Sequence, residues 1–161
     1  MDDLTINVVG YTERLSEIKL IRVQVFQIEQ GVAPDLEFDG KDEIAKHLLA
    51  YCNNQPVGTS RVRYLDDKTA KIERLAVLSD ARGKGIGQQL MIKALELAEQ
   101  AGIKVVVVHA QEYVKGLYEK LGFEVMGESF EEAGIVHVKM VKQLKSYTVY
   151  HKCCINQQNF K

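Results

Sequence analysis

"RLAVLSDARGKGIGQQLMIKALELAEQAG", residues 74–102, places three closely spaced glycines and two cations between a strand-like run and a strongly helical one. Apolar residues recur along its second half at the spacing of one helix face, and Gly102 is a typical helix end. The start of a helix presents unpaired backbone N–H groups, and glycines let another molecule approach them closely. The stretch therefore predicts a strand, a glycine loop and a helix, with an anion such as a pyrophosphate bound where the helix begins.

Two common phosphate-binding motifs do not fit this stretch. The P-loop motif needs a glycine where Leu78 stands and a serine or threonine where Gly85 stands. The dinucleotide motif needs a third glycine where Gln88 stands, within a parallel β-α-β unit that the flanking sequence lacks. A tight turn before a helix, without any ligand, is the structural alternative.

The residues before this stretch predict a strand, a helix and three antiparallel strands. Residues 4–9 alternate as a strand, and Thr12 is a suitable cap for a helix that runs to about Glu29. A loop or broken helix follows, with an acidic stretch over residues 35–43. Strands are expected at residues 47–52, 57–65 and 70–78. The first helix would face the core through Leu15, Ile18, Ile21, Val25 and Ile28.

The residues after it predict a buried strand, a helix and a hairpin. Residues 103–108 form a β-branched run without alternation, which is typical of a central strand covered on both faces. A helix over residues 111–121 ends at Gly122, and residues 123–126 and 135–141 close the sheet as a hairpin. We therefore expect a single α+β domain over residues 1–145, with a mixed, mostly antiparallel sheet of about six to seven strands flanked by helices.

Composition limits the classes of partner. The chain has 161 residues and a formal net charge of -1, so no global field draws it to nucleic acid or to an acidic membrane. Its longest apolar run is too short to cross a bilayer, and its first residues are acidic, which favours a cytoplasmic protein. Cys52, Cys153 and Cys154 are expected to be reduced thiols. Residues 146–161 lose the hydrophobic period and are either a short appended element or a disordered tail.

The glycine loop, with its neighbours, resembles one enzyme family. Arg82-Gly83-Lys84-Gly85-Ile86-Gly87 is similar to the signature of the GCN5-related N-acetyltransferases (GNAT), and residues 72–77 and 118–123 resemble that family's neighbouring segments. Residues 25–30, 37–42 and 134–140, with His47, resemble its ElaA/YjcF-like subgroup. The resemblance covers residues 4 to about 142. It implies the GNAT fold, acetyl-CoA as cofactor and N-acetyltransferase activity.

The same resemblance assigns cofactor-binding roles. The loop and helix start would hold the pyrophosphate of acetyl-CoA, and Gln111 matches a position that contacts the cofactor. The backbone N–H groups of the strand would bind the pantetheine arm and polarise the acetyl carbonyl, unless ordinary strand pairing occupies them. The expected cofactor-binding residues are Leu75, Ala76, Val77, Arg82, Gly83, Lys84, Gly85, Ile86, Gly87, Gln111 and Tyr118.

Two side chains are the candidates for acid–base chemistry. Glu73 matches the family's general base, and strict alternation would place it among Leu75 and Val77, where desolvation raises a carboxyl pKa. The alternative is a surface carboxylate paired with a neighbouring lysine. Tyr118 matches the general acid near the sulfur of CoA, and a phenol has a basicity comparable to that of a thiolate. The alternative is a core tyrosine that packs with Leu121 and Phe123.

The acceptor side is expected at the acidic segment. Its carboxylates would attract a cationic amine, unless the segment is only a solvated loop, and two histidines at strand positions are either part of that site or structural. The candidate substrate-binding residues are Glu29, Gln30, Glu37, Asp39, Asp42, His47 and His137. No metal is expected, because no second histidine lies at helical ligand spacing and the acidic cluster lacks a complete calcium-loop signature.

These interpretations define one main function and two alternatives. No cysteine has the context of a nucleophile, so direct attack of a primary amine on the thioester is expected, with the amine carried by a small molecule or a peptide. The resemblance also favours a homodimer. A non-catalytic acyl-CoA-binding regulator is the first alternative. The second is an acyltransferase of the autoinducer-synthase type, which Arg22, Phe26 and the acidic segment resemble but which the absence of tryptophan disfavours.

Overall fold

Among the described residues, eight strands form one mixed sheet in the order β1-β2-β3-β4-β5-β8-β6, and β7 pairs with β8 off this path. The computed structural model describes residues 2–145. Within them β4 and β5 run parallel and all other neighbouring strands run antiparallel. The strands are β1 (Leu4–Val9), β2 (Lys46–Cys52), β3 (Gln55–Tyr64), β4 (Thr69–Val77), β5 (Val105–Gln111), β6 (Glu124–Val125), β7 (Phe130–Glu132) and β8 (Ile135–Gln143).

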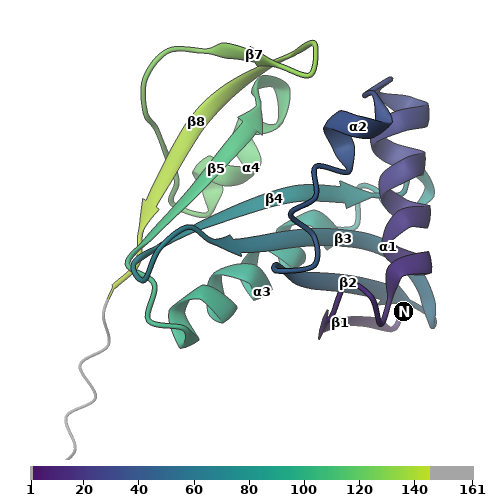
Figure 1. Cartoon of the computed structure of the whole chain (residues 1–161). Coiled ribbons are helices and arrows are strands. Elements are labelled where there is room, and N and C mark those ends of the chain that lie inside the picture. The colour runs from purple at the N-terminus through teal and green to yellow at the C-terminus, as the bar shows by residue number, and fades with distance from the viewer. Residues whose placement is uncertain (1, 146–161) are drawn as a thin grey trace, which may run out of the picture.

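Helices cover both faces of this sheet (Figure 1). The long helix α3 (Ile86–Gln100) packs on one face through Ile86, Leu90, Met91 and Ala94, against the larger core cluster. On the other face α1 (Leu15–Arg22) packs through Ile18 and Ile21, against a smaller cluster. The remaining helical segments are η1 (Val23–Glu29), α2 (Pro34–Glu37), η2 (Ser79–Ala81), η3 (Glu112–Val114) and α4 (Lys115–Lys120).

The predicted fold class is confirmed: a single α+β domain around a mixed, mostly antiparallel sheet. The strand expected at residues 103–108 is β5, and it lies inside the sheet between β4 and β8, as predicted. It runs on to Gln111, however, so Gln111 ends a strand and does not begin a helix. The prediction also omitted β7, a three-residue strand that forms the hairpin with β8.

The first helix departs from the prediction at both ends. It begins at Leu15, and Arg14 rather than Thr12 precedes it, with no side-chain cap. After Arg22 it widens into the π-helix η1, where the Gln30 N–H donates to the Val25 carbonyl five residues back. The wider turn rotates the apolar stripe, so Ile28, expected in the core, is 65% exposed. π-helical turns are rare in proteins overall, but they occur frequently at functional sites. This segment is therefore a candidate part of the functional site.

The sheet opens between β4 and β5. These strands pair over residues 69–71 and 105–107 and then diverge, as Figure 1 shows, so that β5 and β8 rise away from β4. A parallel pair buried in a continuous sheet normally keeps pairing along its length. The divergence leaves one edge of the later part of β4 without a strand partner among the described residues.

The predicted tail at residues 146–161, with Cys153 and Cys154, lies outside the described residues. Cys52, in β2, is a free thiol within the described residues. None of the helices among residues 2–145 has both the length and the apolar character that crossing a membrane requires.

Candidate active site

The glycine loop forms an open cradle at the start of α3. Gly83 and Gly85 adopt left-handed backbone angles, with φ of 79° and 76°, which glycine reaches without steric cost. Gly85 is the N-cap residue of α3, and it offers no side chain to cap the first amides of the helix. A Cβ placed on Gly83 or Gly85 would meet no atom within 4 Å. The cradle therefore exposes uncapped helix amides, which is the geometry that binds anions.

The two cations of the loop are held apart from each other. Arg82 donates from Nε to the Val77 carbonyl at 2.9 Å and pairs through Nη2 with Glu29 at 2.7 Å. Lys84 pairs with Asp2 at 2.9 Å, and its side chain is half exposed. Both positive charges stand at the rim of the cradle, where they add to the charge of the helix end.

A β-bulge in β4 decides which side chains face the cleft. Arg74 has a φ of 54°, unusual for a residue other than glycine, and the register with β3 shifts between Thr59 and Arg61. As a result Glu73 and Arg74 both reach the face that carries α1 and α2, whereas Leu75 and Val77 pack toward the α3 core. The predicted alternation, which put Glu73 with Leu75 and Val77, is therefore wrong.

Beyond this bulge, the cradle and the open edge of β4 line one cleft of about 810 Å³. Residues from η1, α2, β4, the glycine loop, β5, α4 and β8 contribute to its walls. Most of the predicted site residues meet there, namely Glu29, Gln30, Glu37, Asp39, Glu73, Leu75, Ala76, Val77, Arg82, Gly83, Gly85, Ile86, Gly87, Gln111, Tyr118 and His137. Lys84, Asp42 and His47 do not line it.

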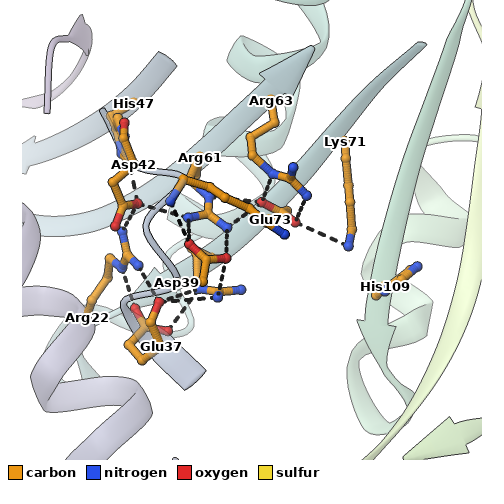
Figure 2. Close-up of polar contacts among 12 residues, drawn as sticks. Arg22, Glu37, Asp39, Asp42, His47, Arg61, Arg63, Lys71, Glu73 and His109 are labelled. Atoms are coloured by element: carbon orange, nitrogen blue, oxygen red, sulfur yellow. Dashed lines mark hydrogen bonds and ion pairs between the residues drawn. The ribbon is translucent and has the colours of Figure 1, made fainter. Parts of the chain in front are cut away.

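Arginines neutralise the acidic segment that was expected to attract a cationic amine. Figure 2 shows these carboxylates turned toward guanidinium groups. Arg22 pairs with Glu37 and, at 2.6 Å, with Asp42, and Arg61 binds Asp39 through both terminal nitrogens. Arg74 adds contacts to Glu37 and Asp39. Three arginines thus face three carboxylates, and the predicted excess of negative charge is not found.

Asp42 and His47 lie too deep to contact a substrate. Asp42 is 4% exposed and is held by Arg22 and Arg61, at 2.6 and 3.0 Å. His47 is 1% exposed, its Nε2 lies 2.8 Å from the Asp42 carbonyl, and burial lowers its pKa. The expectation that these two residues bind the acceptor is therefore wrong. They fix the acidic segment against β2.

Glu73 lies in the cleft, but its electrostatic setting is the reverse of the one expected. Its carboxylate is bound by Arg61 at 2.6 Å, by Arg63 at 2.8 and 2.9 Å, and by Lys71 at 3.2 Å. Burial by itself raises the pKa of Glu73, but the hydrogen bonds from Arg63 and the charges of Arg61 and Lys71 lower it to about 2. The predicted rise in this pKa is wrong, because desolvation is outweighed by three cations.

Tyr118 is both a core residue and a cleft residue. Its ring is 7% exposed and makes an edge-to-face contact with Phe123, at 5.8 Å between centroids. Its hydroxyl makes no hydrogen bond within residues 2–145, although the side chain lines the cleft. Burial raises the pKa of this hydroxyl to about 12. At neutral pH the group is therefore a hydrogen-bond donor.

A pair of glutamines ties the acceptor side to β5. The Gln111 amide donates to Gln30 at 2.9 Å, and the Gln30 amide donates back at 3.4 Å. Together with the contact between Glu29 and Arg82, this pair fastens the end of η1 both to β5 and to the glycine loop. The π-helical segment therefore contacts two of the elements predicted to bind the cofactor.

The far wall of the cleft contains residues that the sequence did not single out. His109, at the end of the apolar run in β5, lies 3.6 Å through Nδ1 from Glu132 of β7. His137, which was predicted, is 7% exposed, lies near Gln111 in the register of β5 and β8, and has its Nδ1 2.7 Å from the Ile135 carbonyl. One signal was available for His109, a polar residue directly after four valines.

Comparison with known proteins agrees with this architecture. Residues 14–144 match the family described as "Acetyltransferase (GNAT) domain", so the chain belongs to the GNAT family. It is 36% identical over 132 residues to the uncharacterized N-acetyltransferase YjcF of Bacillus subtilis, which covers 81% of this chain and 93% of YjcF. The predicted ElaA/YjcF-like family membership is confirmed.

Solved structures share the fold. The crystal structure of Escherichia coli ElaA superposes with a TM-score of 0.78 at 28% identity, covering 86% of this chain and 99% of ElaA. A GNAT family acetyltransferase from Elizabethkingia anophelis, solved with acetyl-CoA bound, gives a TM-score of 0.63 at 21% identity, covering 89% of this chain and all of that one (100%).

Proposed function

We propose that this chain is an acetyl-CoA-dependent N-acetyltransferase that transfers the acetyl group directly to a primary amine of a small molecule or peptide. One observation carries the proposal: the uncapped start of α3 and the unpaired edge of β4 open into the same cleft. A diphosphate fits the first feature, and an extended arm with amide groups fits the second. The family neighbour from Elizabethkingia anophelis, which has the same fold, was solved with acetyl-CoA bound.

The residues at the cradle suit a diphosphate group. The first N–H groups of α3 would donate hydrogen bonds to its oxygens, with Gly83 and Gly85 leaving the approach clear and Lys84 adding charge at the rim. Arg82 would have to exchange its contact with Glu29 for the phosphate. Ile86 and Gly87 stand at the first turn of α3. The Ile86 side chain packs in the core and supports the loop, and Gly87, which has no side chain, leaves the approach clear.

The residues of β4 suit the remainder of acetyl-CoA. Backbone groups of Leu75, Ala76 and Val77 lie along the edge that β5 leaves free, and they can bind the pantetheine arm without depending on side-chain identity. The Gln111 amide lies at the opposite edge, on β5. In our proposal the pantetheine arm lies between β4 and β5, in the place that a paired strand would occupy in a continuous sheet.

Tyr118 is assigned to the leaving group. With a pKa of about 12 it is a weaker acid than a free phenol, so donating a hydrogen bond to the departing sulfur suits it better than complete proton transfer. Its buried ring fixes the direction of the hydroxyl. The proposed role is therefore stabilisation of negative charge on sulfur.

Glu73 is assigned to the acceptor end of the cleft. A carboxylate with a pKa of about 2 is a weak base at neutral pH, so Glu73 is better suited to holding Arg63 and Lys71 in place than to removing a proton. Arginines balance the charges of Glu37 and Asp39. These carboxylates therefore give the site no preference for a polycationic acceptor over an amine with one charge. Gln30, Asp39 and His137 remain the proposed acceptor contacts.

A thiol-release assay over a library of amines tests this function, and calorimetry with CoA tests cofactor binding separately. We expect binding of CoA, turnover with at least one primary amine, and a loss of roughly ten- to a hundredfold in kcat for Tyr118→Phe, the range for a hydrogen bond to a charged group. Tyr64→Phe, on β3 and outside the cleft lining, is the matched control and should keep full activity.

The alternatives give different results in the same assay. Binding of CoA without turnover of any amine would favour the non-catalytic acyl-CoA-binding module over the enzyme. Turnover with long-chain acyl-CoA in preference to acetyl-CoA would favour an acyltransferase of the autoinducer-synthase type. The cytoplasmic location and the homodimer, both expected from the sequence, remain predictions.

A further inference from the structure

His109 stands where β4 and β5 begin to separate. The last paired rung joins Lys71 to Val107, and Glu73 and His109 each lie two residues beyond it. Alternation along β5 buries Val106, Val108 and Ala110 in the α3 core and turns His109 to the opposite face, toward Lys71 and Glu73. Figure 2 shows His109 on the strand next to this network and apart from it. The imidazole therefore lines the cleft across the opening from Glu73.

The ring is held by β7. Its Nδ1 is buried, makes no hydrogen bond of normal length within residues 2–145, and lies 3.6 Å from Glu132 Oε2. Phe130 packs against the ring edge to face, at 5.0 Å between centroids. The side chain is nevertheless 28% exposed, so its accessible atoms belong to the other edge of the ring, which includes Nε2. An imidazole that has a carboxylate beside Nδ1 and a free Nε2 is arranged to accept a proton at Nε2.

The neighbouring groups carry both signs of charge. Lys71 and Glu73 face His109 from β4, Glu132 from β7, and Lys139 and His137 from β8, with Lys139 directly opposite His109 in the register. His137 is less suited to accept a proton from a substrate. It is more deeply buried, and its Nε2 points toward Glu132, at 3.9 Å. Of the two histidines, His109 has the more exposed side chain, at 28% against 10%.

We propose that His109 accepts the proton of the acceptor amine, with Glu132 as the positioning residue that orients its ring. The inference rests on the proposed function. The acceptor enters as an ammonium ion and passes one proton to Nε2, so that its neutral nitrogen can bond to the acyl carbon. The C–S bond then breaks with its electron pair on sulfur, and the sulfur takes up the second proton that the nitrogen loses. The imidazolium releases its proton to water, so that ammonium ion and thioester yield amide, thiol and a proton.

The test is the pH dependence of His109→Gln with an amine whose own pKa is near 10. At pH 7 we expect kcat/KM to fall about a hundredfold, the usual contribution of a general base. Near pH 10 the amine is neutral without help, so the variant should approach the wild type. His109→Asn should behave in the same way. A merely structural role would give an equal loss at every pH, and that result would overturn the inference.

The second readout does not need turnover. In the NMR spectrum of the free protein, the ring nitrogen signals of neutral His109 should show the proton on Nδ1, and Glu132→Gln should weaken this tautomer preference, because a carboxylate beside Nδ1 favours an N–H there. Ring signals that Glu132→Gln leaves unchanged would contradict the role of Glu132. The proposed function fails by a different result, namely a wild type that acetylates no amine. A wild type that is active, with His109→Gln equally active at pH 7, would refute only the inference.

Discussion

Glu73 shows how the environment of one residue changes its chemistry. Three cations from two strands bind its carboxylate, so the group that occupies the family's base position is the anion of an ion cluster. Removing such an anion would leave Arg63 and Lys71 without the carboxylate that binds them, while Arg61 would keep only Asp39 and Asp42. Glu73 therefore contributes to stability, and its effect on the cleft comes through the side chains that it holds.

We predict a pH-dependent difference in stability between the wild type and Glu73→Gln. The pKa of Glu73 falls from 4.5 to about 2 on folding, so its stabilisation is present above pH 4.5 and is lost as the pH falls through about 2. The difference in unfolding free energy should be on the order of 2 kcal/mol near neutral pH, after allowance for screening by solvent at the cleft. Chemical denaturation at several pH values measures it.

Glu96→Gln is the matched control for this prediction. Glu96 pairs with Lys93 at 3.7 Å on the exposed face of α3, where a single ion pair contributes little. Its difference from the wild type should stay small at every pH. A Glu73→Gln difference of the same size at pH 2 and at pH 7 would show that the ion cluster does not hold this carboxylate ionised.

At the scale of elements, the bulge in β4 separates the proposed cofactor side from the proposed acceptor side. The extra residue at Arg74 lets two consecutive side chains, Glu73 and Arg74, face the acidic segment. It also turns Leu75 and Val77 toward the α3 core. In a regular strand Glu73 would share a face with Leu75 and Val77, and Arg74 would point to the opposite face, because side chains alternate strictly in an undistorted strand.

We predict that Arg74→Gly retains more stability than Arg74→Ala. Both variants lose the contacts of Arg74 with Glu37 and Asp39. Alanine also has to adopt the φ of 54°, which costs roughly 1 kcal/mol more for a side chain than for glycine. Urea denaturation of the two variants measures the difference. Equal stability, or a more stable alanine variant, would mean that the backbone relaxes out of the bulge.

The π-helix η1 has a comparable effect on the acceptor side. It follows directly from α1, and its end carries Glu29 and Gln30, which contact the glycine loop and β5. In a continuous α-helix these two side chains would point in other directions, because the turn would be narrower. The widened segment thus brings the acceptor side into contact with both strands of the opening.

At the scale of the whole molecule, the site lies where the sheet divides. The first four strands form one half and β5 with its neighbours forms the other, joined through three rungs of parallel pairing. Helix α3 begins at the open end of this division, because the glycine loop directly follows η2 and β4. The glycine loop, the open edge of β4 and the wall formed by β5, β7 and β8 therefore line one cleft.

The sequence predicted the parts of this arrangement that depend on local pattern. The strands, α3 and the loop at Gly83 and Gly85 have signatures in apolar spacing and in residue type. The pairing of Arg61 with Asp39, Asp42 and Glu73 had none, because it joins residues far apart in the chain. The bulge could not be predicted either, since arginine, unlike glycine, gives no sign of a positive φ.

The most direct test of the account is the affinity for CoA of Gly85→Leu, measured by calorimetry beside Gly102→Leu. Both glycines have a positive φ, 76° and 78°, and open space around a Cβ, but they stand at opposite ends of α3. The two variants should therefore lose similar stability. We predict that Gly85→Leu weakens CoA binding by about tenfold or more and that Gly102→Leu binds as the wild type does. Equal affinity in both variants would contradict a diphosphate site at the start of α3.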